Sequence, residues 1–153
     1  MSSEIIKKFV TGNHQNSNSD VIAEWNLMIK NGSMPSIDVQ DWSHFGYAAL
    51  HYHIKHDSDE AMEWLLSRRP QPNVNLTAFN NHTALYIAVM YNEPSKVRLL
   101  LDNGADRSIS NGRGETPLDI ARRSKYLDHK CIEDRSKIIR MLKSYYPDIA
   151  QTR

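Results

Sequence analysis

A short run of residues in the middle of the chain occurs twice, with a spacing of 33 residues. The first copy reads TALYIA at residues 83–88, and the second reads TPLDIA at residues 116–121. A fixed period of this size is typical of proteins built from stacked structural repeats, in which each unit contacts only its neighbours. The repeat therefore predicts a stack of small units, each too short to bury its apolar face alone.

The repeated segment resembles the ankyrin unit, which has this period and a T-P-L-H-x-A core. Thr116, Pro117 and Leu118 match the beginning of that core, and Leu50 and His51 match it in an earlier, less regular copy. The resemblance implies an all-α solenoid of about four stacked helix-turn-helix units, with short hairpin fingers instead of a sheet. It implies a single ankyrin-repeat domain at residues 1–147, with units at about 3–38, 43–77, 78–110 and 111–147 and a polar tail at 148–153.

Local signals place the helices within these units. Thr83 and Thr116 stand where an N-cap belongs, and Pro117 suits the first helical position because an N–H there would be unpaired. Apolar spacing and turn residues predict further helices at about 5–10, at 21–30 after an N-cap at Asp20, at 58–67 and at 134–145. The last unit is longer than the period, and we place its additional residues in an inserted loop at 125–133.

The composition indicates a soluble, intracellular protein without a strong general charge. Lys and Arg together number 19 and Asp and Glu 18, so the net charge is close to zero and gives no reason to expect nucleic acid or a membrane as partner. Cys131 is the single cysteine, which excludes an intrachain disulfide and favours a reducing compartment. No apolar run approaches the length of about 20 residues that a membrane span needs. We expect a cytoplasmic monomer, with delivery into a host cell left open.

Two groups of residues raise the question of metal binding or catalysis. His51, His53 and His56 are close in sequence, but on a helix His51 lies about 200° from His53 and about 140° from His56. His51 also coincides with the histidine of the ankyrin core, and the resemblance implies a structural role for it. Cys131 and His129 lack any flanking signature of a nucleophile. We therefore expect no catalytic residues, no metal site and no cofactor.

The resemblance also implies where a partner would bind, because ankyrin repeats usually meet their partners with the finger tips and the inner helices. Large apolar and aromatic side chains occupy several of these positions, although stacking of the units does not require them there. The candidate partner-binding residues are Trp42, His44, Phe45, Tyr47, Phe79, Asn80, His82, Met90, Tyr91, Arg113 and Arg123. For Phe45 and Phe79, simple packing against the neighbouring fingers is an open alternative.

These observations predict a non-enzymatic protein–protein interaction module that acts by occupying its partner, as an adaptor, an inhibitor or a pathogen effector. One alternative is an electrostatic binder of nucleic acid or acidic lipid, since residues 113–153 carry ten basic and six acidic side chains. The basic residues considered are Arg122, Arg123, Lys125, Lys130, Arg135, Lys137, Arg140 and Lys143. We expect a solvated helix face and no nucleic-acid partner, because Arg135, Lys137 and Arg140 are spread around a helix. Self-association through the aromatic residues is a further alternative.

Overall fold

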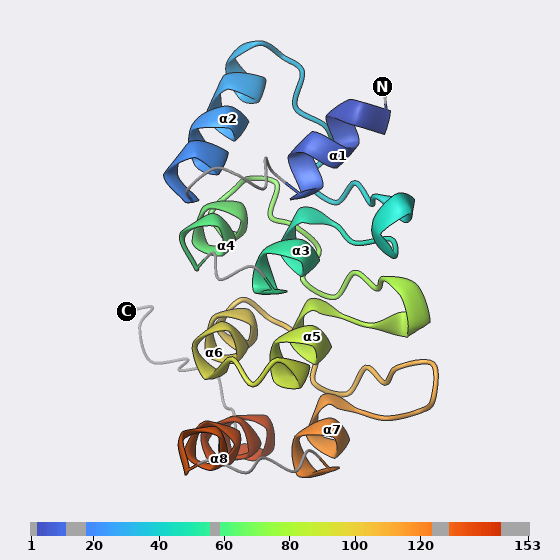
Figure 1. The fold of residues 1–153 in the computed structure, drawn as a ribbon, viewed down its shortest axis with the longest axis vertical. Helices are drawn as coiled ribbons and strands as arrows, with labels where there is room; N and C mark the ends of the chain where they lie inside the picture. Colours follow the sequence, from blue (N-terminus) through green and yellow to red (C-terminus); the bar gives the residue numbers. More distant parts are fainter. Residues whose placement is uncertain (1–2, 12–17, 56–58, 124–128, 145–153) are drawn as a thin grey trace.

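The computed structural model of this chain describes residues 3–11, 18–55, 59–123 and 129–144. Within these ranges the chain forms eight α-helices and two short 3₁₀ turns. The helices follow one another in pairs that stack along a single direction (Figure 1). In chain order they are α1 (Ser3–Thr11), α2 (Asn18–Lys30), α3 (Ala49–Lys55), α4 (Asp59–Leu66), α5 (Ala84–Met90), α6 (Pro94–Asp102), α7 (Pro117–Arg123) and α8 (His129–Ser144). The all-α repeat fold predicted from the sequence is confirmed.

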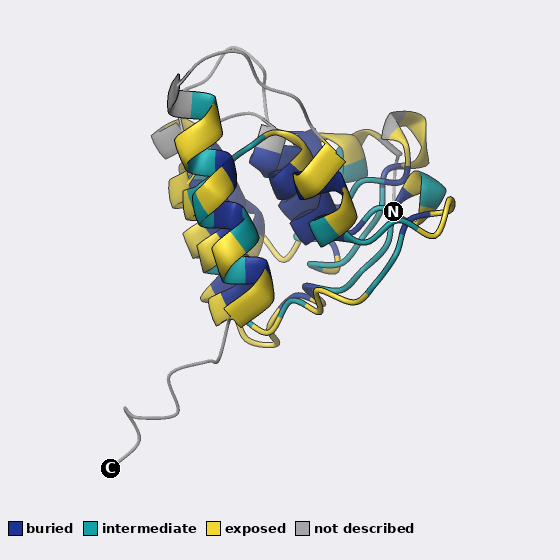
Figure 2. Cartoon of the chain, turned by 90° about the horizontal axis from the view of Figure 1, so that it is seen from below, coloured by how far each residue is buried: buried dark blue, intermediate teal, exposed yellow. Residues whose placement is uncertain are grey.

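The helices form two columns, an inner column of α1, α3, α5 and α7 and an outer column of α2, α4, α6 and α8 (Figure 1). Each inner helix contacts the next one, and α5 in the middle is buried along its whole length from Ala84 to Val89. The outer helices expose one side to solvent (Figure 2). A seven-residue helix such as α5 gains its stability from this stacking, because short isolated helices are unstable in water.

Three finger loops project from the inner column, and we define them as residues 41–47, 77–83 and 111–115. The first two are closed by isolated antiparallel bridges, Asp41 with Tyr47 and Thr77 with Thr83. Neighbouring fingers are joined by backbone hydrogen bonds, from Phe79 N to Phe45 O (2.8 Å) and from Gly112 N to Asn80 O (2.8 Å). In the described ranges these contacts do not extend into a strand, so the fingers are hairpins without a sheet, as predicted.

The predicted helix caps are present. The hydroxyl of Thr83 accepts a hydrogen bond from the backbone N–H of Tyr86 (3.1 Å), at the start of α5. Thr116 and Asp119 cap α7 reciprocally, because Thr116 N donates to Asp119 Oδ2 (2.9 Å) and Asp119 N to Thr116 Oγ1 (3.3 Å). These bonds satisfy N–H groups that have no partner inside the helix.

Two boundaries predicted from the sequence are wrong. Helix α2 starts at Asn18, so Asp20 lies in its first turn, where a carboxylate favours the helix dipole without being the N-cap. Helix α8 starts at His129, so residues 129–133 of the expected loop are helical. The additional turn of α8 rests against the α5–α6 connection, where Asn92 Nδ2 donates to Cys131 O (3.4 Å). Residues 124–128 and the tail at 148–153 lie outside the described residues.

Two buried cations join successive units. Lys96 of α6 is 1% exposed, and its ammonium group donates to Ile54 O in the last turn of α3 (2.9 Å). Arg135 of α8 is also buried, and its Nη1 donates to Val89 O near the end of α5 (2.6 Å). The C-terminal carbonyls of a helix lack partners inside the helix and carry partial negative charge, which favours a cation there. Arg135 is therefore a structural residue, which corrects its assignment to a solvated basic face.

His51 is a buried structural histidine. Its Nδ1 accepts from Ala48 N (3.3 Å), and its Nε2 lies 2.9 Å from Leu76 O, so the neutral ring protonated on Nε2 satisfies both contacts. Burial lowers the pKa of His51 from 6.5 to about 4. These bonds connect α3 to the segment that leads into the second finger.

The low pKa of His51 predicts a loss of stability in mild acid. The folded protein keeps this ring neutral down to about pH 4, whereas the unfolded chain protonates it below about pH 6.5. Its contribution to stability is therefore complete above the unfolded pKa and is lost as the pH falls toward the folded pKa. We expect the free energy of unfolding to drop by about 2 kcal/mol between pH 7 and pH 5 because of this residue.

Urea titrations at the two pH values measure this drop. In the control variant His51→Gln, the pH dependence should shrink by the same amount, whatever its absolute stability. Equal pH dependence in the two proteins would contradict the prediction, as would an NMR titration that gives His51 an ordinary pKa.

Candidate protein-binding surface

Most of the apolar residues predicted to meet a partner are exposed. Trp42 is 71% exposed, Phe45 66%, Phe79 64%, Tyr91 42% and Met90 38%, while Tyr47 is partly buried. We call these six residues the aromatic face. They lie on the first two finger loops and at the C-terminal end of the inner helix α5.

The two finger-tip phenylalanines contact each other without being buried. The ring centroids of Phe45 and Phe79 are 6.2 Å apart, and that of Tyr47 lies 6.1 Å from Phe45. Phe45 has a positive φ of 59°, which turns the chain at the tip of the first finger. The two phenylalanines therefore pack against each other, but about two thirds of each side chain is still exposed to solvent.

The ring of Trp42 lies against a glycine of its own finger. Gly46 has a φ of +67°, and a Cβ at this position would come within 2.7 Å of the Trp42 ring. Glycine is therefore required both by the backbone conformation and by the space that the indole occupies. The contact fixes one side of the indole, while most of the side chain is exposed.

Tyr47 connects the finger tips with the inner helices. Its ring stacks on His51 with a centroid distance of 5.8 Å and an interplanar angle of 14°. Burial raises the pKa of Tyr47, and the neighbouring phenol of Tyr91 raises this pKa further. Tyr91 at the end of α5 is thus near enough to Tyr47 of the first finger to affect its phenol.

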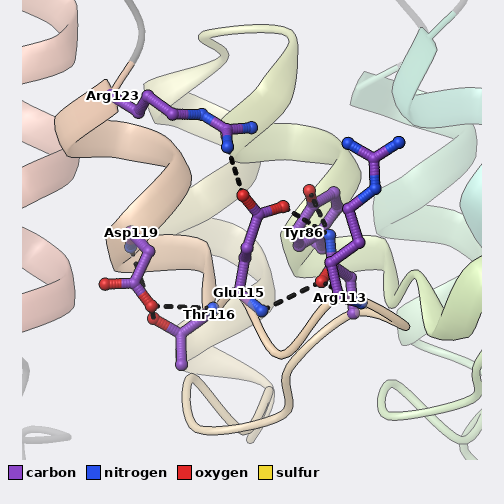
Figure 3. A network of polar contacts seen from close by, with 7 residues as sticks. Tyr86, Arg113, Glu115, Thr116, Asp119 and Arg123 are labelled. Atoms are coloured by element: carbon purple, nitrogen blue, oxygen red, sulfur yellow. Dashed lines mark hydrogen bonds and ion pairs between the residues drawn. The ribbon is translucent and has the colours of Figure 1, made fainter.

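A polar network joins the third finger to α5 and α7 (Figure 3), and the third finger lies beside the second one, which carries Phe79. His82 stacks on Tyr86 at 4.4 Å, and the Tyr86 hydroxyl accepts from Asn111 Nδ2 (2.9 Å). The same Nδ2 donates to Glu115 Oε2 (2.9 Å), and Arg123 Nη1 donates to Glu115 Oε1. Burial is the main cause of the raised pKa of Tyr86. This network connects Tyr86 of α5 to Arg123 of α7 through Asn111 and Glu115.

The two arginines among the predicted partner-binding residues, Arg113 and Arg123, differ in their environment. The guanidinium of Arg123 is paired with Glu115, whereas that of Arg113 lies on the other side of Glu115 and has no drawn contact (Figure 3). Among the described residues, Arg113 makes a hydrogen bond only through its backbone N–H, to Asn111 Oδ1 (2.9 Å). Of these two arginines, Arg113 is therefore the one whose guanidinium makes no hydrogen bond or ion pair within the described residues.

The remaining predicted site residues are placed as follows. Asn80 has a φ of 58° at the tip of the second finger, and its Nδ2 lies 3.2 Å from His82 Nε2. His44 lies in the 3₁₀ turn Trp42–His44, and its side chain is outside the described part of the structure. Sequence reasoning missed Tyr86 and Asn111, although Tyr86 replaces the histidine of the T-P-L-H pattern.

We find no group of three or more His, Cys, Asp or Glu side chains within the described ranges that could hold a metal ion. Cys131 is partly buried at the start of α8, and the side chain of His129 lies outside the described part. Of the helices described, none is long and apolar enough to cross a membrane.

Stacked helix pairs with hairpin fingers define a repeat protein of the ankyrin type. The chain belongs to the ankyrin-repeat family, since the profile described as "Ankyrin repeats (3 copies)" matches residues 3–109 and again residues 50–152. Repeats of this family are generally protein–protein interaction modules and are typically non-enzymatic.

The chain is also similar to alpha-latrotoxin-Lg1a of Latrodectus geometricus, with 38% identity over 73 residues. This match covers 47% of the chain and 5% of the toxin. The chain therefore spans only a small part of the length of this relative.

Proposed function

We propose that the aromatic face binds a protein partner, with Arg113 at its border taking an acidic group of that partner. The full set of partner-binding residues is Trp42, His44, Phe45, Tyr47, Phe79, Asn80, His82, Met90, Tyr91, Arg113 and Arg123. Binding occupies the partner's surface and involves no chemical step. The protein then acts as an adaptor, an inhibitor or a pathogen effector, depending on what the bound surface would otherwise do.

The exposure of the aromatic face is the observation that supports this proposal most strongly. Phe45 and Phe79 remain about two thirds exposed although they sit next to each other on adjacent fingers. Exposed apolar patches on soluble proteins usually mark a contact, and aromatic side chains dominate the energetics of interfaces. The ring of Tyr47 stacks on His51 and that of Trp42 lies against Gly46, so these two side chains lose less entropy on binding than free ones would.

The polar residues of the third finger add a preference for a negatively charged group of the partner. The free donors of Arg113 suit a carboxylate, with which an arginine forms two parallel hydrogen bonds. Arg123 is already paired with Glu115 and would have to exchange this partner. We therefore expect a partner segment with large apolar side chains over the fingers and an acidic residue near Arg113.

The test compares the triple variant Phe45→Ala/Phe79→Ala/Tyr91→Ala with wild type in affinity capture from cell lysate, followed by direct titration of the captured, purified protein. Truncating one large side chain at the centre of an interface weakens the free energy of binding by about 1–2 kcal/mol, so we expect the affinity of the triple variant to fall at least about a hundredfold. The matched control is Leu27→Ala/Ile29→Ala/Ile132→Ala, which removes three apolar side chains of comparable exposure from α2 and α8.

The control should bind as wild type does, and circular dichroism should show both variants folded. Equal affinity of wild type and the aromatic variant for the captured protein would overturn the proposal. Equal losses in the two triple variants would also do so, because the effect would then be unspecific.

The electrostatic alternative has weaker support. Arg135 is buried, Arg123 is paired with Glu115, and Lys137 is paired with Glu133 and Asp134 of its own helix. The basic residues of the C-terminal unit therefore do not act as one free surface. Binding of duplex DNA that falls steeply with salt and survives the aromatic triple variant would favour this alternative.

A further inference from the structure

An open groove of about 490 Å³ lies between the outer helices α6 and α8. Helix α8 lines it with Lys137, Arg140, Met141 and Ser144, whose spacing places them in one stripe of the helix. Helix α6 contributes Arg98 opposite this stripe. We infer that this groove binds an acidic segment of a polypeptide, at a site separate from the aromatic face.

The positive charge of the groove comes mainly from the guanidinium groups of Arg98 and Arg140. Arg98 makes no hydrogen bond or ion pair within the described residues, and Arg140 donates only its Nε, to Ser136 O (3.4 Å). Lys137 is partly neutralised, because its ammonium group lies 3.0 Å from Glu133 and 3.2 Å from Asp134. Arg98 and Arg140 therefore present free forked donors from two sides of the groove, and such donors match carboxylate oxygens.

The floor of the groove suits a side chain with an apolar stem. Met141 is partly buried there, between the two cationic walls. A glutamate can place its methylene groups against the thioether while its carboxylate reaches a guanidinium.

The neighbouring groove argues against a long polyanion. It lies between α4 and α6, has an open volume of about 300 Å³ and is lined by Asp59, Glu63 and Asp102. Arg98 borders both grooves. A nucleic-acid backbone that continues across the outer helices would meet these three carboxylates, and a flat anionic membrane would also face them. A short acidic segment fits into the α6–α8 groove alone.

The groove and the aromatic face lie on different sides of the molecule. The outer helices form one side, and the finger loops project from the other (Figure 2). Both sites can therefore be filled at once, and loss of one leaves the other unchanged.

Fluorescence anisotropy with a labelled peptide of alternating Glu and Ala tests the inference. We expect the double variant Arg98→Gln/Arg140→Gln to bind this peptide about tenfold more weakly than wild type. The matched control is Arg122→Gln/Lys143→Gln, which removes the same charge from exposed positions outside the groove. It should bind within about twofold of wild type, because exposed charges away from a site contribute little.

Three results would overturn the inference. The first is absence of peptide binding to wild type, and the second is an equal loss in the two double variants, which would reduce the effect to net charge. The third is tighter binding of a DNA oligonucleotide or of phosphatidylserine vesicles than of the peptide, with the same loss in the groove variant. The aromatic triple variant should bind the Glu-Ala peptide as wild type does, which separates this test from that of the proposed function.

Discussion

Replacing Trp25 with alanine should lower the free energy of unfolding by about 3–5 kcal/mol, the range for truncating a fully buried large aromatic residue. Trp25 is completely buried in α2, and its ring centroid lies 5.6 Å from Phe9, 5.2 Å from His53 and 4.9 Å from Trp64. Its Nε1 also donates to Phe9 O (3.1 Å). One side chain thus joins α1 and α2 to α3 and α4.

The loss should be confined at first to one end of the stack. In a solenoid each unit is stabilised by its nearest neighbours, so a broken interface separates the terminal unit from the rest. We expect urea unfolding of Trp25→Ala, followed by circular dichroism, to split into two steps. Hydrogen exchange should accelerate in α1 and α2 before it does in α5.

An exposed tryptophan provides the matched control for this prediction. Trp42→Ala should change the free energy of unfolding by less than about 1 kcal/mol, since the side chain is 71% exposed. A Trp25→Ala variant that unfolds in one step with uniform hydrogen exchange would show that the first unit does not depend on this contact.

Replacing Lys96 with alanine should lower the free energy of unfolding by about 3 kcal/mol. The substitution removes a buried four-carbon stem and leaves the carbonyl of Ile54 buried without its donor, and an unsatisfied buried acceptor alone costs about 1–3 kcal/mol. The carboxylate of Asp59 lies 3.9 Å from the ammonium group and is more than half exposed, so its attraction adds little. Urea titration measures the difference between the variant and wild type.

The variant Lys96→Met separates packing from the hydrogen bond. Methionine fills about the same space but has no hydrogen-bond donor, so we expect the free energy of unfolding to fall by about 1–2 kcal/mol. The loss should hardly change with salt, because a buried donor is poorly screened. Equal and small losses in the alanine and methionine variants would mean that the bond from Lys96 to Ile54 O does not stabilise the stack.

The fold could be predicted from the sequence because its signals are local and repeated. Thr83 and Thr116 cap their helices through atoms three residues away, and Gly32 ends α2 with a φ of +66°. The exposure of Phe45 and Phe79 also follows from their place in the repeat, since finger-tip side chains are not needed for stacking. The starts of α2 and α8 were placed too late in the sequence, because residues 18–19 and 129–133 show no regular apolar spacing that would mark them as helical.

The sequence by itself determined the repeat period, the stacking of helix pairs and the positions of the exposed aromatic residues, since each depends on residues within one unit or on its copy. Only the tertiary structure decided which charged residues are buried or free. Lys96 and Arg135 donate to the carbonyls of Ile54 and Val89, which are 42 and 46 residues away, and Arg98 and Arg140 line one groove from two different helices. A charged side chain interacts with the groups that are close to it in space. Between different units, that closeness is created by the stacking of the helices and cannot be read from neighbouring residues in the chain.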